Sequence, residues 1–197
     1  YAFRNLEGGP KRDPNFKWDW KVFREEKKKL KIDYPPEHVI DKQIVLKNLE
    51  KYKSESYVMW LDHASFIIKL GDTTIITDPV FEKNYGPMIF GPKKFIESPL
   101  TLKEIPKINL FLLTHNHYDH MSIRTIKNFP YKDAKVLAPL KLGKYFTRNG
   151  YKKDTVKEMD WFDKIKINDE ITVTMLPSQH WSKRWIWGDG NTNRSLW

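Results

Sequence analysis

Apolar and polar positions divide the chain near Tyr57. Upstream of this point apolar residues are sparse and four prolines interrupt residues 1–36, which predicts an irregular arm. Two helices are predicted within this part, over Asp19–Lys31 and over Glu37–Tyr52, with Pro36 at the start of the second. Their apolar sides would be Trp20, Phe23 and Leu30 in the first helix, and Ile40, Ile44 and Leu49 in the second.

A different pattern begins after Tyr57, where β-branched and aromatic residues gather in runs. Val58–Leu70 and Thr73–Thr77 are two such runs, and Gly71-Asp72 separates them, which predicts a β-hairpin. Pro79 donates no ladder hydrogen bond, so the second strand ends there and leaves Asp78 at its carboxyl tip.

The rest of the chain alternates strand and helix patterns. The predicted strands are Ile108–Thr114, Lys135–Ala138 and Ile171–Leu176, and the predicted helices run from Ser122 to Phe129 and from Pro139 to near Gly150. This order predicts an α/β fold.

Three of the predicted strands lead into residues that bind metals well. Asp78, His115 and His180 each follow a strand, and functional sites of α/β folds form at the carboxyl ends of strands. The pattern therefore predicts that these three residues meet at one site.

Composition sets the remaining limits. The 197 residues, 40% of them hydrophobic, suffice for one good-sized domain, and we predict an N-terminal arm with helices over residues 1–56 and a domain over residues 57–197. The net charge of +10 favours an anionic partner, although a solvated lysine-rich face explains it equally well. The chain has no cysteine, so a metal would be held by His, Asp or Glu.

The sequence leaves the compartment open between cytoplasmic and membrane-associated. No apolar stretch reaches the about 18–20 residues that a membrane span needs. Because the chain begins at Tyr1, an upstream signal or anchor stays an open alternative.

The segment Thr114-His115-Asn116-His117-Tyr118-Asp119-His120 carries the chemistry. Three of the six histidines fall within it. Without a metal ion, each buried imidazole would need its own polar partner. One zinc ion would satisfy several imidazoles together. His115 and His117 can point to the same side of an extended turn, while His120 can aim elsewhere. One short loop can thus supply two adjacent metal positions.

The pattern His-x-His-x-Asp-His resembles the signature of the metallo-β-lactamase superfamily. Its neighbours are similar to segments of the group of N-acyl-phosphatidylethanolamine-hydrolysing phospholipases D. These neighbours are Trp60–Ser65, Thr77–Phe81, Gly91–Phe95, Leu176–Arg184 and Asn193–Trp197. The resemblance implies an αβ/βα sandwich fold.

The resemblance also implies the ligands of two zinc ions. His115, His117 and His180 would hold the first, and Asp119 and His120 would contribute to the second. Asp119 would in addition act in catalysis, by positioning or activating the attacking hydroxide.

Two further residues match the family pattern outside the metal loop. Asp78 corresponds to the family's strand-end aspartate and would support the metal loop from behind. His63 lies where the family reads Gly-His-Ala and this chain reads Asp62-His63-Ala64, and a buried structural role explains it as well as a functional one.

The family completes its two-metal site with a bridging aspartate and a final histidine beyond the segment that matches Asn193–Trp197. Asp189 comes too early to be that bridge. We therefore expect only the N-terminal half of the sandwich, with one zinc ion or none in this chain. The exposed half would bind a missing C-terminal half or self-associate.

Three functions follow from these observations. The leading hypothesis is a zinc-dependent hydrolase of phosphodiester bonds, truncated here, with a phospholipid as the implied substrate and a peripheral membrane contact. The alternatives are a metal-dependent nuclease, which is less favoured although the chain is basic, and an inactive metal-binding fragment.

Residues after His180 allow two interpretations each. Lys183 and Arg184 would either bind a phosphate or form an exposed charged pair. For Trp181 and Trp197, packing against the core is favoured over a lipid-facing groove, and for Trp185 and Trp187 both alternatives stay open.

Overall fold

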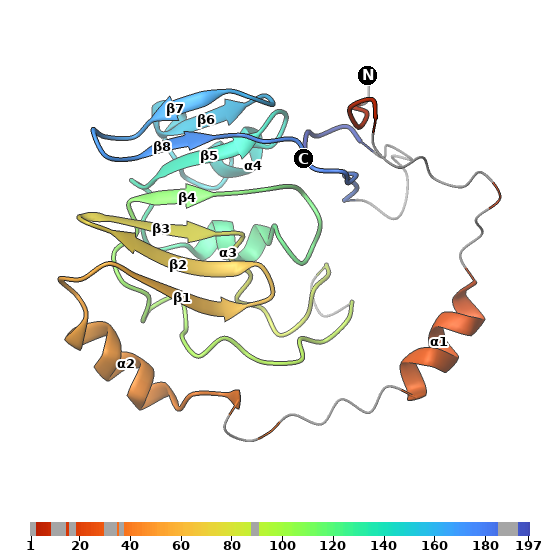
Figure 1. Cartoon of the computed structure of the whole chain (residues 1–197), viewed down its shortest axis with the longest axis horizontal. Coiled ribbons are helices and arrows are strands. Elements are labelled where there is room, and N and C mark those ends of the chain that lie inside the picture. Colours follow the sequence, from red (N-terminus) through yellow and green to blue (C-terminus); the bar gives the residue numbers. More distant parts are fainter. Residues whose placement is uncertain are drawn as a thin grey trace.

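The computed structural model describes residues 3–8, 15, 19–29, 35, 38–87, 91–184 and 193–197. A six-stranded sheet forms its centre, with the strands side by side in the order of the sequence (Figure 1). The strands are β1 Tyr57–Asp62, β2 Ser65–Leu70, β3 Thr73–Thr77, β4 Leu110–Leu112, β5 Lys135–Pro139 and β6 Val156–Met159. The pairs from β1 to β3 are antiparallel and those from β3 to β6 are parallel.

Four helices and a second, smaller sheet complete the described part of the chain. The helices are α1 Trp20–Lys29, α2 Lys42–Lys51, α3 Ile123–Asn128 and α4 Gly143–Thr147, and a 3₁₀ turn covers Lys153–Thr155. A two-stranded ribbon consists of β7 Lys164–Lys166 and β8 Thr172–Thr174. None of the described helices is long and apolar enough to cross a bilayer.

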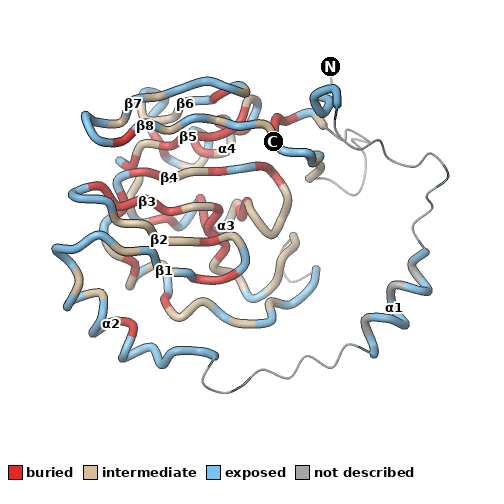
Figure 2. Tube along the Cα trace, viewed as in Figure 1, coloured by how far each residue is buried: buried red, intermediate tan, exposed pale blue. Residues whose placement is uncertain are grey.

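The sheet is buried on both faces because its strands alternate between two cores. On β4, Phe111 points to the larger core, which also contains Ile126 of α3 and Phe146 of α4. Leu110 points to the other face, where Ile165 of the ribbon covers it. Figure 2 shows the buried residues concentrated in the central strands. The α/β prediction is confirmed, with helices on one face and the β7–β8 ribbon on the other.

The second predicted helix exists, but of its three predicted inward residues only Leu49 packs against the core, whereas Ile40 and Ile44 are exposed. Asp41 caps α2 by accepting a hydrogen bond from Gln43 N, so the helix begins after Ile40. This start turns Val45 into the core and leaves Ile44 52% exposed. The helix predicted around α1 also exists and lies apart from the sheet (Figure 1). The side chains of its predicted apolar positions lie outside the described residues.

The predicted hairpin is a three-stranded meander. The run Val58–Leu70 contains a turn at His63 and Ala64 that separates β1 from β2. No glycine, proline or asparagine marks this turn, and His63 itself adopts a left-handed φ of 38°. The sequence therefore showed one strand where the structure has two.

The helix that was predicted from Pro139 starts later. Pro139 is the last residue of β5, and α4 begins at Gly143, where the backbone N–H donates to Glu158 at 2.7 Å. Strands β6 and β7 were missed, because their alternation is short and mostly polar. The proposed division at residue 57 stays a prediction, although Val45 joins the domain core.

Candidate metal centre

The parallel pairing of β3 with β4 brings two polar strand ends together. Thr77 pairs with Leu112, so Asp78 lies beside the start of the loop that carries the histidines. The Asp78 backbone N–H donates to Leu112 O at 3.0 Å, and its carboxylate accepts from Thr114 N at 2.7 Å and from Thr114 Oγ1 at 2.5 Å. Asp78 is 1% exposed and thus fixes the loop from within.

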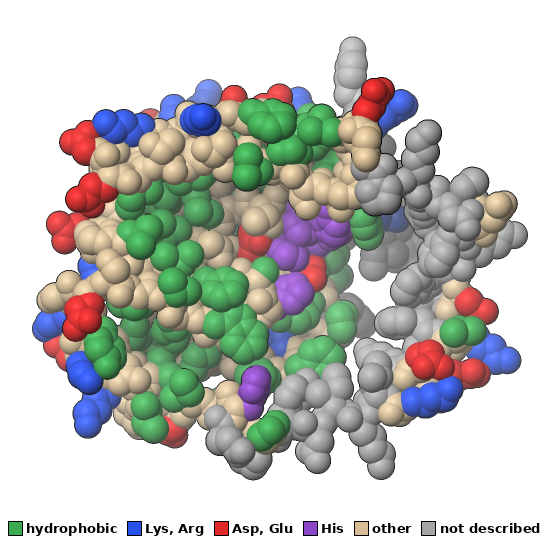
Figure 3. Space-filling view, in the orientation of Figure 1, with side chains coloured by type: hydrophobic (Ala, Val, Ile, Leu, Met, Phe, Trp, Pro, Cys, Tyr) green, Lys and Arg blue, Asp and Glu red, His purple; other side chains and the backbone are tan. Residues whose placement is uncertain are grey.

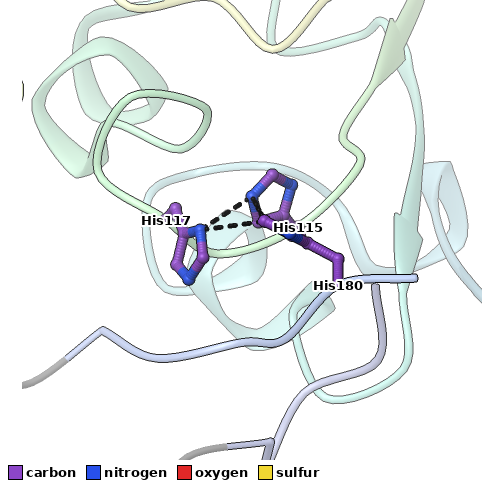
Figure 4. Close-up of side chains that lie close together, drawn as sticks. All are labelled: His115, His117 and His180. Carbon is purple, nitrogen blue, oxygen red and sulfur yellow. Dashed lines mark hydrogen bonds between the residues drawn. The ribbon is translucent and has the colours of Figure 1, made fainter. Parts of the chain in front are cut away.

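Three imidazole rings converge next to this strand end (Figure 4). His115 Nε2 lies 3.0 Å from His117 Nδ1 and 3.1 Å from His180 Nε2, and the third separation, from His117 Nδ1 to His180 Nε2, is 3.2 Å. His115 and His117 come from the loop after β4, whereas His180 follows β8. The fold therefore joins residues that are 65 positions apart in the sequence.

The surroundings of these three rings favour the neutral imidazole over the charged form. Burial, together with the neighbouring histidines, lowers the pKa of His115 from its usual value to about 2. Burial and then His180 lower the pKa of His117 to about 4, and burial lowers that of His180. A neutral imidazole offers a nitrogen lone pair, which is the form that binds metals.

Hydrogen bonds also fix which nitrogen of His115 is protonated. The Thr114 hydroxyl donates to Asp78, so it can accept from His115 Nδ1, which lies 2.9 Å away. The proton then sits on Nδ1 and the lone pair on Nε2 faces the cluster. Asp78 thereby controls His115 through Thr114. This role of Thr114 was not predicted from the sequence. The only sequence feature that could have indicated it is the position of Thr114 directly before His115.

The geometry fits a tetrahedral transition-metal ion. A zinc ion bound about 2.0–2.1 Å from each nitrogen requires the nitrogens to lie about 3.3 Å apart. The three observed separations of 3.0–3.2 Å come close to this value. With three converging nitrogens and few protons to share, hydrogen bonds among the rings cannot satisfy all of them. The residues present thus fit a divalent metal.

Asp119 and His120 lie in a second cluster beside the first. His120 Nδ1 contacts Asp78 Oδ2 at 2.8 Å, and His120 Nε2 lies 3.8 Å from Asp119 Oδ2. The rings of His115 and His120 are 4.0 Å apart, so the two clusters adjoin. His63 is not buried: its side chain is 42% exposed, and its Nε2 lies 3.0 Å from Asp119 Oδ2.

Arg184 holds the metal loop and is not an exposed charge. Its Nη1 donates to Asn116 O at 3.0 Å and to Met121 O at 2.5 Å, and its guanidinium lies 4.4 Å from the centre of the Tyr118 ring. Burial lowers the pKa of Arg184 to about 10. Its charge is thus used within the fold, which the sequence pattern could not show.

The two ends of the chain pack around His180. Asn5 Oδ1 accepts from His180 N at 3.1 Å and from Trp197 Nε1 at 3.0 Å. Trp197 is 3% exposed, as expected for a packing residue. Trp181 contradicts the same expectation, because it is 46% exposed and lies 4.3 Å from the ring of His117. Trp185 and Trp187, for which packing and a lipid-facing groove both stayed open, lie outside the described residues.

A cavity of about 510 Å³ borders the clusters. His115, His120 and His180 line one side of it. The other walls are mostly apolar and come from Leu112, Leu137, Met159, Val173, Met175, Leu176 and Trp197. In Figure 3 the histidines appear at the surface among hydrophobic side chains. A substrate that reaches the metal would therefore meet a mostly apolar wall.

A family model described as a β-lactamase superfamily domain matches residues 73–197, which is more than half of the chain. The chain belongs to the β-lactamase superfamily. The predicted α/β fold class of this superfamily is thereby confirmed. The match contains both the loop after β4 and His180, and so includes every residue of the three-histidine cluster.

Individual superfamily relatives include phospholipases. The mitochondrial N-acyl-phosphatidylethanolamine-hydrolysing phospholipase D of Saccharomyces cerevisiae is 32% identical over 152 residues, which is 75% of this chain and 31% of that protein. The phospholipase D 1 of the same kind from Caenorhabditis elegans is 29% identical over 172 residues, covering 81% and 48%. The predicted resemblance to this group is confirmed.

Other relatives carry more general names. A metal-dependent hydrolase of Caldivirga maquilingensis is 31% identical over 124 residues, covering 63% of this chain and 48% of that protein. A solved metallo hydrolase from Ignicoccus hospitalis is similar with a TM-score of 0.47 and 18% identity, covering 64% of this chain and 50% of that one. The chain spans less than half the length of these curated relatives.

Proposed function

We propose that the protein is a zinc-dependent hydrolase of phosphodiester bonds with a phospholipid substrate. The observation that supports this most strongly is the convergence of His115, His117 and His180 on one point, with nitrogen separations of 3.0–3.2 Å. Zinc suits three neutral imidazoles, and the chain has no thiolate to favour a softer ion. Zinc bound there supplies Lewis-acid chemistry for the hydrolysis of phosphoryl groups.

Protein residues would position the reactants. The Asp119 carboxylate is 37% exposed, so it can hold a proton of the attacking water at Oδ2. Asp78 keeps His115 and His120 in the tautomers that leave Nε2 without a proton. Trp181 lies against His117 and shields that side of the site from water.

The lining of the cavity favours a lipid substrate over a nucleic acid. Its walls opposite the histidines consist largely of Leu, Val and Met side chains, which match hydrocarbon better than ribose and phosphate. Names of relatives at about 30% identity support the same substrate class. Exposed apolar side chains on α2 and β1, including Ile44, Val58 and Trp60, would support a peripheral membrane contact.

Hydrolysis of N-acylphosphatidylethanolamine vesicles by the zinc-loaded protein tests this proposal. We expect release of phosphatidic acid, with activity reduced at least about a hundredfold in His117→Gln because a metal ligand is lost. His38→Gln is the matched control, since His38 belongs to none of the metal-capable groups among the described residues. Zinc-loaded protein that cleaves neither these vesicles nor bis(p-nitrophenyl) phosphate would contradict the proposal.

Two other functions remain as alternatives to be tested alongside. The net charge of +10 favours a nuclease, which would bind RNA or DNA with a steep dependence on salt concentration and cleave it. An inactive metal-binding fragment would hold at most one metal ion and cleave nothing. Binding of two ions per chain would count against that last alternative.

A further inference from the structure

We propose that Asn5, near the N-terminal end, is a positioning residue that holds His180 in place as a metal ligand. Asn5 Oδ1 accepts hydrogen bonds from His180 N at 3.1 Å and from Trp197 Nε1 at 3.0 Å. The oxygen of an asparagine side chain has two lone pairs, so it can accept both bonds at once. Asn5 thereby ties His180 to Trp197, which is buried. The proposal rests on the metal centre of the proposed function and not on its substrate.

His180 depends on such support because it lies in neither a helix nor a strand. Strand β8 ends at Thr174, and His180 follows in an irregular segment. His115 and His117, by contrast, lie in the loop whose backbone is held by hydrogen bonds to Asp78 and Arg184. The place of the third imidazole is therefore set by the contacts that hold this irregular segment.

Hydrogen bonds hold the segment on both sides of the histidine. Before it, Ser178 O accepts from Trp197 Nε1 at 2.9 Å. After it, Ser182 N donates to Asn193 Oδ1 at 2.9 Å, and Asn193 N donates back to Ser182 O at 2.6 Å. The bond to Asn5 lies between these two points and fixes the backbone at the metal ligand itself.

Residues 3–8 contact the same region at a second point. Phe3 N donates to Asn193 O at 2.6 Å, and the ring of Phe3 packs edge-to-face on that of Trp197, with centroids 6.4 Å apart and an interplanar angle of 89°. Figure 1 shows the two ends of the chain near each other. The beginning of the chain is thus tied to the metal centre, although Asn5 and His180 lie 175 positions apart in the sequence.

Asn5 is itself exposed, and this decides what its hydrogen bonds contribute. Water can replace the side chain as the acceptor at His180 N, so loss of the bond should change the stability of the fold little. Without Asn5, however, the segment around His180 can adopt other orientations, and a metal ion would have to order it on binding. The bond therefore raises metal affinity by holding the ligand ready, with little effect on folding.

Packing alone would give Asn5 a different role. If Asn5 only filled space beside Trp197, any side chain of similar size would serve. Asn5→Leu tests this, because leucine has nearly the same shape but accepts no hydrogen bond. Asn5→Asp is the rescue variant, because a carboxylate oxygen can accept the same two bonds. Leu6→Ala is the matched control, since it changes the next side chain along, which is 46% exposed.

Titration of the chelator-treated protein with Co²⁺, followed by its d–d absorption, tests the proposal without any substrate. We expect Asn5→Leu to bind the first ion about tenfold more weakly than the wild-type protein, because a supporting partner of a ligand is lost. Asn5→Asp and Leu6→Ala should bind this ion at least as tightly as the wild-type protein. Urea unfolding of the metal-free proteins should give the same midpoint for all of them, which separates metal affinity from stability.

A double-mutant cycle shows whether Asn5 acts through His180. In the background of His180→Gln there is no imidazole left to position, so adding Asn5→Leu should not weaken Co²⁺ binding further. In the background of His117→Gln, His180 is still present, and Asn5→Leu should again weaken binding about tenfold. A general structural effect of Asn5 would instead give the same loss in both backgrounds.

Three results would overturn the proposal. The first is wild-type affinity for Co²⁺ in Asn5→Leu, and the second is an equal loss of affinity in the two backgrounds of the cycle. The third is a loss in Asn5→Asp as large as that in Asn5→Leu, because the bonds that Asn5 accepts would then be irrelevant. A wild-type chain that binds no Co²⁺ would overturn this inference and the proposed function together. Metal binding as expected without phosphodiesterase activity would overturn the proposed function alone.

Discussion

Replacing Asp78 by asparagine would test how the fold prepares the metal ligands. The carboxylate accepts three hydrogen bonds: Oδ1 from Thr114 N, and Oδ2 from Thr114 Oγ1 and from His120 Nδ1. Asparagine has nearly the same shape and tolerates the left-handed φ of 38° at this position. The variant therefore changes hydrogen-bond chemistry while the backbone conformation is preserved.

The expected effect follows from the amide group. If the asparagine amide oxygen keeps the hydrogen bond from Thr114 N, the asparagine NH₂ group faces Thr114 Oγ1 and His120 Nδ1. In the wild-type protein both of these groups donate to Asp78, so in the variant two donors would face another donor. His120 would then shift its proton to Nε2 and lose the lone pair that faces Asp119. Loss of such a supporting partner costs about 10–100-fold in metal affinity, or about 1.4–2.8 kcal/mol. His115 depends on Asp78 only through Thr114, so its cluster should lose less.

Competition of the protein with a chromophoric chelator for Zn²⁺ measures both affinities. Asp72→Asn, at the exposed β2–β3 turn, is the matched control and should behave as wild type. The buried amide should also lower the free energy of unfolding by about 1–3 kcal/mol, as measured in urea. An Asp78→Asn protein with wild-type affinity at both sites would refute the reasoning, because Asp78 would then control neither histidine.

Three further predictions concern pH, the metal loop and association. Since burial lowers the pKa of His117 to about 4 while that of an unfolded histidine is about 6.5, the free energy of unfolding of metal-free protein should fall as pH drops below about 6.5. Urea unfolding should show a shallower fall for His117→Gln, and equal slopes would contradict this. Arg184→Met should lower the free energy of unfolding by about 2–3 kcal/mol because two charged hydrogen bonds are lost. The matched control Arg148→Met changes an exposed arginine and should leave the free energy of unfolding unchanged. Equal losses in both variants would argue against a structural role for Arg184. Leu176 is 65% exposed at the apolar cavity, so sedimentation velocity should show self-association that Leu176→Lys weakens about tenfold, and a monomer at all concentrations would disprove it.

Much of the site could be predicted from local sequence. The spacing of His115, His117 and His120 within one loop indicated metal binding without any tertiary information. Strand patterns before Asp78 and His115 placed both residues at strand ends, because Pro79 stops one ladder and the apolar run of β4 ends before Thr114. Helix α3 was also predictable, since Ser122 caps it through a bond to Thr125 N.

Other features had no local signal. The turn at His63 has no glycine, proline or asparagine, and the side chains of Trp60, Ser65 and Thr77 hold it in place. Asp41 caps helix α2, so the helix begins at Lys42 and Val45 faces inward. The spacing of apolar residues alone did not show where the helix begins.

The sequence by itself determined which chemical groups are available and that several metal-type ligands gather in one loop, because ligand type and close spacing are local properties. Tertiary structure decided which atoms meet. The parallel pairing of β3 with β4 lets Asp78 set the proton positions on two rings, and the packing of distant segments brings His180 to the first cluster and His63 to Asp119. Likewise, only folding directs Arg184 inward to backbone carbonyls. Such contacts depend on burial and strand pairing across the whole domain, which no short stretch of sequence contains.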